Sequence, residues 1–135
     1  KTRELWQSFM PLRNQIQNRA DTNFYSVEVY PGVHFFQQFN PQAKFEKWAA
    51  VKVFDITVVP DSMETLIIPS GLYAVFPFKG VPADAPQFLQ YVFGTWMPQS
   101  GYSLDNRPHF ALMGEKYKNN DPDSEEDFWI PIMPV

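Results

Sequence analysis

Apolar residues near the start of the chain recur at the spacing of an amphipathic helix. The stripe consists of Leu5, Phe9, Leu12 and Ile16, which follow one another at intervals of four, three and four positions. Pro11 lies within this stripe and has no backbone donor. We therefore expect a helix over residues 3–19 that kinks, or divides into two short pieces, at Pro11.

Later segments alternate between apolar and polar side chains, which is typical of β-strands. Strands are predicted at residues 25–30, 45–54, 63–68 and 72–78, with turns rich in Pro, Gly and Ser between them. Residues 33–41 show no clear period and predict a loop. The strand at 72–78 is apolar on both faces apart from Tyr73, so we expect it at the centre of the sheet, covered on both sides.

A second helix and two further strands follow. The helix is predicted after Asp84, and its apolar stripe consists of Phe88, Val92 and Trp96, four positions apart, with Leu89 and Phe93 beside it. Pro98 and Gly101 end it. The last strands are predicted at residues 109–117 and 128–133, with an acidic turn at 119–127 between them.

The order of these elements places the chain in the α+β class. A helix followed by a pair of strands occurs twice, so we divide the single domain 1–135 into half-repeats of about 1–58 and 63–135. One helix can cover one face of a small sheet, but a half of this size is too small to fold as a domain. We expect the halves to pack side by side and to leave a central ligand cleft at their junction.

Composition narrows the possible functions. Aromatic residues make up 17% of the 135 positions, more than an aliphatic core requires, and small-molecule pockets are lined mainly by such side chains. Aromatic packing in the core is the alternative reading. The net charge of −4, without a run of Lys or Arg, argues against direct binding of nucleic acid. Without a long apolar run or a leader sequence, we expect a cytoplasmic protein with no membrane contact.

Residues for metal or cofactor chemistry are scarce. The chain has no Cys, and its two His, His34 and His109, lie far apart. Asp121 and Asp123 alternate like the start of a calcium loop, but Glu126 stands where that loop requires Gly. The sequence contains no phosphate-binding glycine motif. We expect no metal and no cofactor.

The strand predicted at 109–117 carries the main candidate for a ligand contact. Glu115 would share a face with Met113 and Tyr117, and a carboxylate among apolar groups needs a proton, a hydrogen bond or a cation. A ligand with diffuse positive charge would satisfy it and stack on aromatic rings. If the strand end is exposed, Glu115 points into water instead.

Other residues complete this candidate site. Trp48 and Trp96 are predicted as pocket walls, and Tyr73 as a polar contact on the apolar strand. Lys52 shares a face with Trp48 and is an alternative partner for Glu115, which would reduce the need for a cationic ligand. The predicted ligand-binding residues are Glu115, Trp48, Trp96, Tyr73, Met113 and Tyr117.

The sequence resembles the GyrI-like effector-binding domains, which occur alone or fused to AraC-type and other DNA-binding regulators. The resemblance spans about residues 5–134. Its motifs are LWQSFMP (5–11), KWAAVKV (47–53), METLIIPSGLYAVFPFKG (63–80), WMPQSGY (96–102), RPHF (107–110), GEKY (114–117) and WIPI (129–132). The run from IPSGLYAVF to WMPQSGY is the most specific of them.

This resemblance implies two strand-helix-strand-strand repeats related by a pseudo-two-fold axis, with an antiparallel sheet and a ligand cleft between them. The first strand of the first repeat is missing before Thr2, which would expose an edge for pairing with a second chain. The resemblance also implies a pocket carboxylate in an E-x-Y pattern, which falls on Glu115. A second alignment puts that acid after RPHF, where Ala111 stands, and then neutral ligands would be preferred.

We therefore expect a stand-alone bacterial module of transcription-regulator type that binds an apolar or aromatic drug-like molecule, cationic or neutral, without catalysis. Its output would need a DNA-binding partner or fused domain, which this chain lacks, and it would act as a monomer or homodimer. One alternative is a hydrolase of reactive small molecules that uses Glu115 as general base with Tyr117 or Tyr73 as donor. A protein-inhibitor module is the other.

Overall fold

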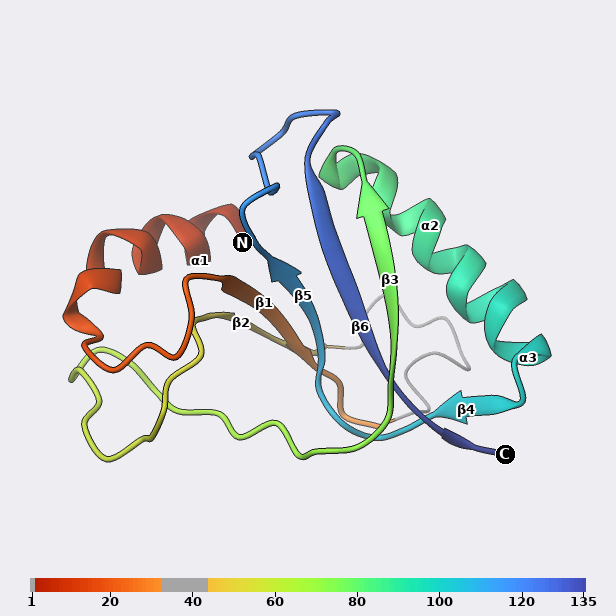
Figure 1. The fold of residues 1–135 in the computed structure, drawn as a ribbon, viewed down its shortest axis with the longest axis horizontal. Coiled ribbons are helices and arrows are strands. Elements are labelled where there is room, and N and C mark those ends of the chain that lie inside the picture. Colours follow the sequence, from red (N-terminus) through yellow and green to blue (C-terminus); the bar gives the residue numbers. More distant parts are fainter. Residues whose placement is uncertain (1, 33–43) are drawn as a thin grey trace.

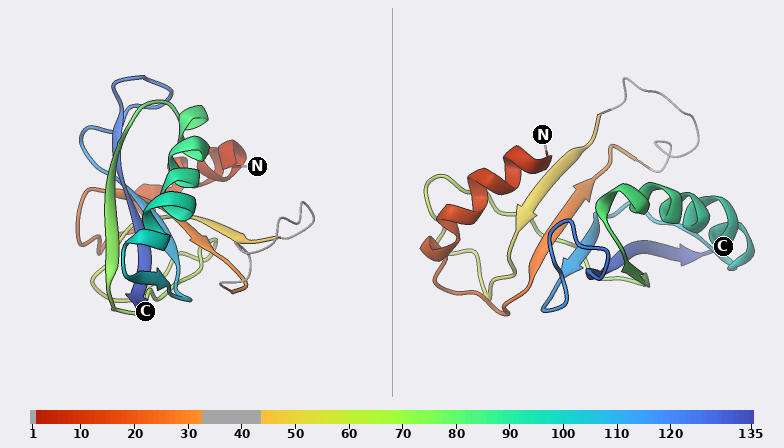
Figure 2. Two further views of the ribbon diagram at one scale, coloured as in Figure 1. Left: turned by 90° about the vertical axis from the view of Figure 1, so that its right-hand side faces the viewer. Right: turned by 90° about the horizontal axis from the view of Figure 1, so that it is seen from above.

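The computed structural model describes residues 2–32 and 44–135, which form an antiparallel sheet with helices on one face (Figures 1 and 2). The predicted loop at 33–41, with His34, lies outside the described residues. The helical elements are α1 (Thr2–Phe9), η1 (Met10–Gln15), η3 (Pro82–Asp84), α2 (Ala85–Tyr91), η4 (Val92–Trp96) and α3 (Met97–Gln99). The strands are β1 (Phe24–Val29), β2 (Glu46–Ala50), β3 (Tyr73–Lys79), β4 (Tyr102–Leu104), β5 (His109–Met113) and β6 (Glu125–Pro134).

The sheet is continuous across the junction of the two halves. Its order is β2-β1-β5-β6-β3, and β4 pairs with the end of β6. All pairs are antiparallel, including β1 with β5, where Ser26 is opposite Ala111 and Glu28 is opposite His109. The predicted α+β class with an antiparallel sheet is confirmed.

The first helix divides close to Pro11, as predicted. α1 ends at Phe9, and the chain continues as the 3-10 helix η1, which has the proline in its first turn. The ring of Trp6 in α1 meets that of Phe24 in β1 edge-on, with 6.2 Å between centroids. α1 therefore covers the first half of the sheet from the face that carries Phe24.

The second helical stretch covers the other half from the same face. It runs through α2, η4 and α3 without a break, and η4 is a π-helical turn. Val92 and Met97 are buried against Ile130 and Ile132 of β6 and form the centre of the core. Among the described residues, no helix is long and apolar enough to cross a membrane.

β3 lies at an edge of the sheet, so its predicted central position is wrong. It pairs with β6, and Val75 in its middle is 43% exposed. The carbonyl of Leu72 accepts the N–H of Ile132 at 3.1 Å. The backbone N–H and C=O groups of even-numbered residues in β3 therefore point toward β6, and the backbone nitrogen of Pro77 points away from it. Because proline has no N–H to donate, an outward-facing position on an edge strand suits it.

Three predicted strands are shorter than expected or absent. Residues 63–68 form no strand, since they pair with no strand of the sheet, and Ile67 is exposed. β5 ends at Met113 because the chain turns at Gly114, whose carbonyl accepts the N–H of Tyr117. β2 stops at Ala50 instead of residue 54.

β6 is longer than predicted, and β4 was not predicted. β6 begins at Glu125, inside the predicted acidic turn, because Glu125 pairs with Lys79 at the end of β3. The three-residue β4 was not predicted and is held by its pairing with β6. The acidic turn is therefore shorter than expected.

Candidate functional site

The helix-facing side of β1 and β5 lies between α1 and α2 (Figure 2). Residues directly opposite in antiparallel strands share a face of the sheet. On the helix-facing side, Trp6 contacts Phe24 and Phe93 contacts His109. We call this side the central strip, and it consists of Phe24, Ser26, Glu28, His109, Ala111 and Met113. The small pair of Ser26 and Ala111 occupies its middle.

Glu126 of β6 is a half-buried carboxylate beside this strip. It continues the alternation of Phe128 and Ile130, which face the helices, and it makes no hydrogen bond or ion pair with any described residue. Burial raises the pKa of Glu126 above its usual value, and the charge of Lys47 opposes that shift. Burial also raises the pKa of Tyr117, and the negative charge of Glu126 raises it further. Glu126 thus interacts through its charge with Lys47 of β2 and with Tyr117 in the turn after β5.

Polar and aromatic groups also meet at the other end of the strip. The hydroxyl of Tyr30 donates to Glu28 Oε2 at 2.8 Å, and the Tyr30 ring lies 4.8 Å from that of His109. Burial lowers the pKa of His109 to about 4, so its imidazole is neutral at physiological pH. Phe93, which contacts His109, comes from the π-turn η4, and such turns are frequent at functional sites.

The structure brings only part of the predicted site to this strip. Met113 ends β5 on the helix-facing side, and Tyr117 lies close enough to Glu126 to feel its charge. Glu115 instead lies exposed in the turn that follows β5, so its predicted place on a strand with Met113 and Tyr117 is wrong. The physical reason is the turn at Gly114, which ends the alternation before residue 115.

Trp96 and Tyr73 lie in other parts of the molecule. Trp96 packs edge-on against Phe76, with ring centroids 5.0 Å apart, between the helix and β3. Tyr73 is on the opposite face of the sheet, where its hydroxyl donates to the carbonyl of Pro108 at 3.3 Å and the Arg107 guanidinium lies over its ring. Both make packing contacts away from the central strip.

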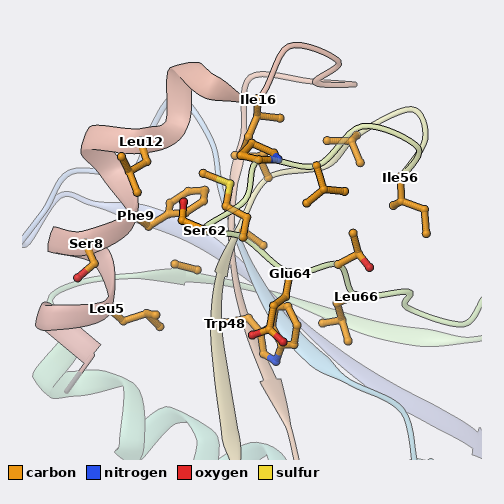
Figure 3. Close-up of a pocket in the computed structure, with 18 of the residues that line it drawn as sticks. Leu5, Ser8, Phe9, Leu12, Ile16, Trp48, Ile56, Ser62, Glu64 and Leu66 are labelled. Atoms are coloured by element: carbon orange, nitrogen blue, oxygen red, sulfur yellow. The ribbon is translucent and has the colours of Figure 1, made fainter.

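Trp48 lines a separate groove of about 690 Å³ at the outer edge of β2 (Figure 3). Side chains from α1, among them Leu5 and Phe9, form one side, and residues 56–66, among them Ile56 and Leu66, form the other. The indole N–H of Trp48 donates to Glu46 Oε1 at 3.2 Å. Trp48 therefore does not share a site with Met113 and Tyr117.

Sequence reasoning missed Glu126 and Lys47, although a signal for each exists. Glu126 is in phase with Phe128, Ile130 and Ile132, so once β6 is extended toward its N-terminus its side chain must face the helices. Lys47 is opposite Glu28 of the strip and therefore shares its face. Among the described residues, no group of three or more His, Cys, Asp or Glu side chains is arranged to hold a metal ion.

Comparisons with known proteins identify a family over almost the whole chain. The model of the GyrI-like small molecule binding domain matches residues 3–133. No curated protein matches the chain. The match includes the helical elements from residue 3 onward, the strands up to residue 133 and every residue of the central strip.

Proposed function

Since the chain belongs to the family of the GyrI-like small molecule binding domain, we propose that the central strip binds an apolar or aromatic molecule with positive charge, without turnover. One observation carries this assignment: Glu126 is half-buried and has no hydrogen-bonding partner among the described residues. Taking a carboxylate out of water costs free energy unless a proton or a cation compensates it. A bound cation would supply that compensation.

The aromatic groups beside the strip favour a ligand whose charge is diffuse. Trp6, Phe24 and Tyr30 present ring faces or edges near it, and such rings attract cations in addition to burying apolar area. Lys47 acts on Glu126 through its charge alone, since no ion pair joins the two side chains. Its positive charge opposes a second cation near the carboxylate, so we expect affinity for cations to depend on Lys47 as well as on Glu126.

Ala111 bears on the choice between cationic and neutral ligands. It lies in the middle of the strip, where the second alignment of the motif RPHF puts the pocket acid of the family. Here the methyl group leaves that position uncharged, and the nearest acids of the same face on the two adjacent strands are Glu28 and Glu126, each two residues from the position opposite Ala111. We infer a weaker preference for cations than a carboxylate at position 111 would give.

In a regulatory setting, a ligand changes the output only through different affinities for two states of the protein. We propose that this chain acts as an effector-sensing module and passes its signal to a DNA-binding partner or a fused domain. The competing hydrolase proposal needs Glu115 as base, and the exposed position of that residue gives it no sheltered pocket in which to activate water.

The test is a pair of ligands with the same shape and different charge, phenyltrimethylammonium and tert-butylbenzene, titrated into the protein by calorimetry. We expect stoichiometric binding with a preference for the cation. Glu126→Gln should weaken cation binding about tenfold, equivalent to about 1.4 kcal/mol, and leave the neutral ligand unchanged. Glu115→Gln is the matched control and should change neither. Equal loss of the cation in both variants, or none in Glu126→Gln, would refute the assignment.

A further inference from the structure

Lys47 is a half-buried cation on the helix-facing side of β2. It lies directly opposite Glu28 on β1, and opposite charges at this spacing stabilise a sheet when they pair. Here the Glu28 carboxylate instead accepts the hydroxyl of Tyr30 at 2.8 Å. The ammonium of Lys47 makes no hydrogen bond or ion pair with any residue that the structure describes. Its charge is therefore uncompensated beside the central strip.

Lys47 and Glu126 lie at diagonally opposite corners of the strip. Lys47 is on β2, at the end of the strip that holds His109, and Glu126 is on β6, at the end that holds Met113. Since β1 and β5 separate the two strands, the residues are about 14 Å apart across the sheet alone. The charge of Lys47 nevertheless acts on the Glu126 carboxylate and opposes the rise in its pKa. Both side chains therefore extend over the strip toward each other, without forming an ion pair.

Two uncompensated charges of opposite sign restrict the ligand further than one carboxylate does. The small side chains of Ser26 and Ala111 form the surface of the sheet between them. A simple cation is attracted by Glu126 and repelled by Lys47, and a neutral molecule leaves both charges without a partner. A molecule with a positive and a negative group at the two ends of an apolar body compensates both side chains at once.

We propose that the ligand of the central strip is an elongated zwitterion, with its cationic group at Glu126, its carboxylate at Lys47 and an aromatic or apolar body over Ser26 and Ala111. This inference rests on the strip as the ligand site and adds an anionic group to the cation proposed above. Lys47 then determines specificity, because it disfavours simple cations and selects those that carry their own negative charge.

Four ligands built on one aromatic ring separate the two charges. 4-(Trimethylammonio)benzoate carries both, phenyltrimethylammonium only the positive one, 4-tert-butylbenzoate only the negative one, and tert-butylbenzene neither. Each is titrated by calorimetry into the intact 135-residue protein and three variants. Lys47→Met removes the charge and keeps an apolar side chain of similar length, and Lys47→Arg keeps the charge. Lys52→Met is the matched control, since Lys52 is exposed.

In the parent protein, we expect the zwitterion to bind about fivefold more tightly than phenyltrimethylammonium, because its carboxylate meets Lys47. The order should reverse in Lys47→Met. There the affinity for the zwitterion should fall about tenfold, and that for phenyltrimethylammonium should rise about threefold as the repulsion is lost. Lys47→Arg should keep the parent order, and Lys52→Met should match the parent protein for all four ligands.

Two results would overturn the proposal. The first is a parent protein that binds phenyltrimethylammonium as tightly as the zwitterion. The second is a change in Lys47→Met by the same factor for both ligands, which would indicate lost packing instead of lost charge. In either case the function proposed above would stand if phenyltrimethylammonium still bound more tightly than tert-butylbenzene and depended on Glu126. Failure of all four ligands to bind would reject both proposals.

Discussion

Ser26 on β1 lies directly opposite Ala111 on β5, and this pair of small side chains occupies the middle of the junction between the two halves. Larger residues stand on either side of it, with Glu28 and His109 at one end and Phe24 and Met113 at the other. The size and charge at position 111 therefore decide what the strip can hold.

The first prediction concerns Ala111→Glu. A carboxylate at this position faces the helices beside Glu126, so we expect phenyltrimethylammonium to bind at least tenfold more tightly. Ala111 is only 8% exposed, and burying a charge there should also lower the thermal stability of the free protein. Calorimetric titration and thermal melting measure the two effects.

Ala111→Gln is the control for side-chain size. It should cost a similar amount of packing without improving cation binding. If Ala111→Gln and Ala111→Glu bound the cation equally well, charge at this position would not govern ligand choice.

The second prediction concerns the pH dependence of stability. Burial raises the pKa of Glu126 above 4.5, so the folded state binds this proton more tightly than the unfolded state does. Its contribution to stability is complete below about pH 4.5 and is lost as the pH rises through the raised pKa. Glu126→Gln should therefore gain stability relative to the parent protein as the pH rises through this range.

Urea unfolding at intervals of pH measures this difference. The exposed Glu115 supplies the matched variant, Glu115→Gln, which removes the same formal charge. The same trend in both variants would assign the effect to net charge instead of burial.

The third prediction concerns His109, whose effect has the opposite sign. Burial lowers its pKa from 6.5 to about 4, so the unfolded state takes up this proton first as the pH falls. Stability from the neutral imidazole is present above pH 6.5 and is lost on the way down to pH 4, by an amount on the order of 3 kcal/mol. His109→Gln should flatten the stability profile over this range.

NMR titration of the His109 ring in the parent protein checks the same claim without a variant. A midpoint near pH 4 is expected. A midpoint near 6.5 would show that the ring is not shielded from water.

The fourth prediction concerns Gly71, which lies against Arg107. A Cβ at position 71 would come within 2.6 Å of the guanidinium carbon. That guanidinium binds Asp105 at 2.8 Å and the carbonyl of Ile132 at 3.2 Å, so displacing it would disturb the connection between β3, β6 and the segment before β5. We expect Gly71→Ala to cost about 2 kcal/mol of stability by urea unfolding.

Gly94 gives the matched substitution. It is exposed in η4, and a Cβ there would meet nothing within 4 Å. Gly94→Ala should therefore be neutral or stabilise the protein by up to about 1 kcal/mol. A similar loss from both substitutions would contradict the role assigned to Arg107.

The sequence predicted those parts of the fold that depend on local rules. The helical stripes, the break at Pro11 and the α+β class follow from periodicity and from proline geometry. The edge position of β3 was not predicted, because apolar residues on both faces are typical of a central strand. Pro77 carried the contrary signal, which becomes clear only when the pairing partner is known.

The candidate site shows a similar limit. The sequence predicted Met113 and Tyr117 on one strand face with Glu115, but Tyr117 lies beyond the end of β5, and the carboxylate whose charge reaches Tyr117 is Glu126, from a strand distant in the sequence. The prediction of Glu115 assumed that alternation continues past Gly114. A turn at Gly114 ends the strand there. The alternation of apolar and polar residues does not show how far the pairing between two strands extends.

The unbroken pairing of β1 with β5 has a consequence for how a signal could leave the molecule. Closing the two halves toward each other would break the hydrogen bonds that join β1 to β5. The binding free energy of a ligand of modest affinity is too small to compensate for their loss. The paired strands form a continuous sheet beneath the proposed ligand site, so we expect the helices above it to respond. A tilt or slide of α1 or α2 over a fixed sheet is the motion through which a downstream partner would sense that the site is filled.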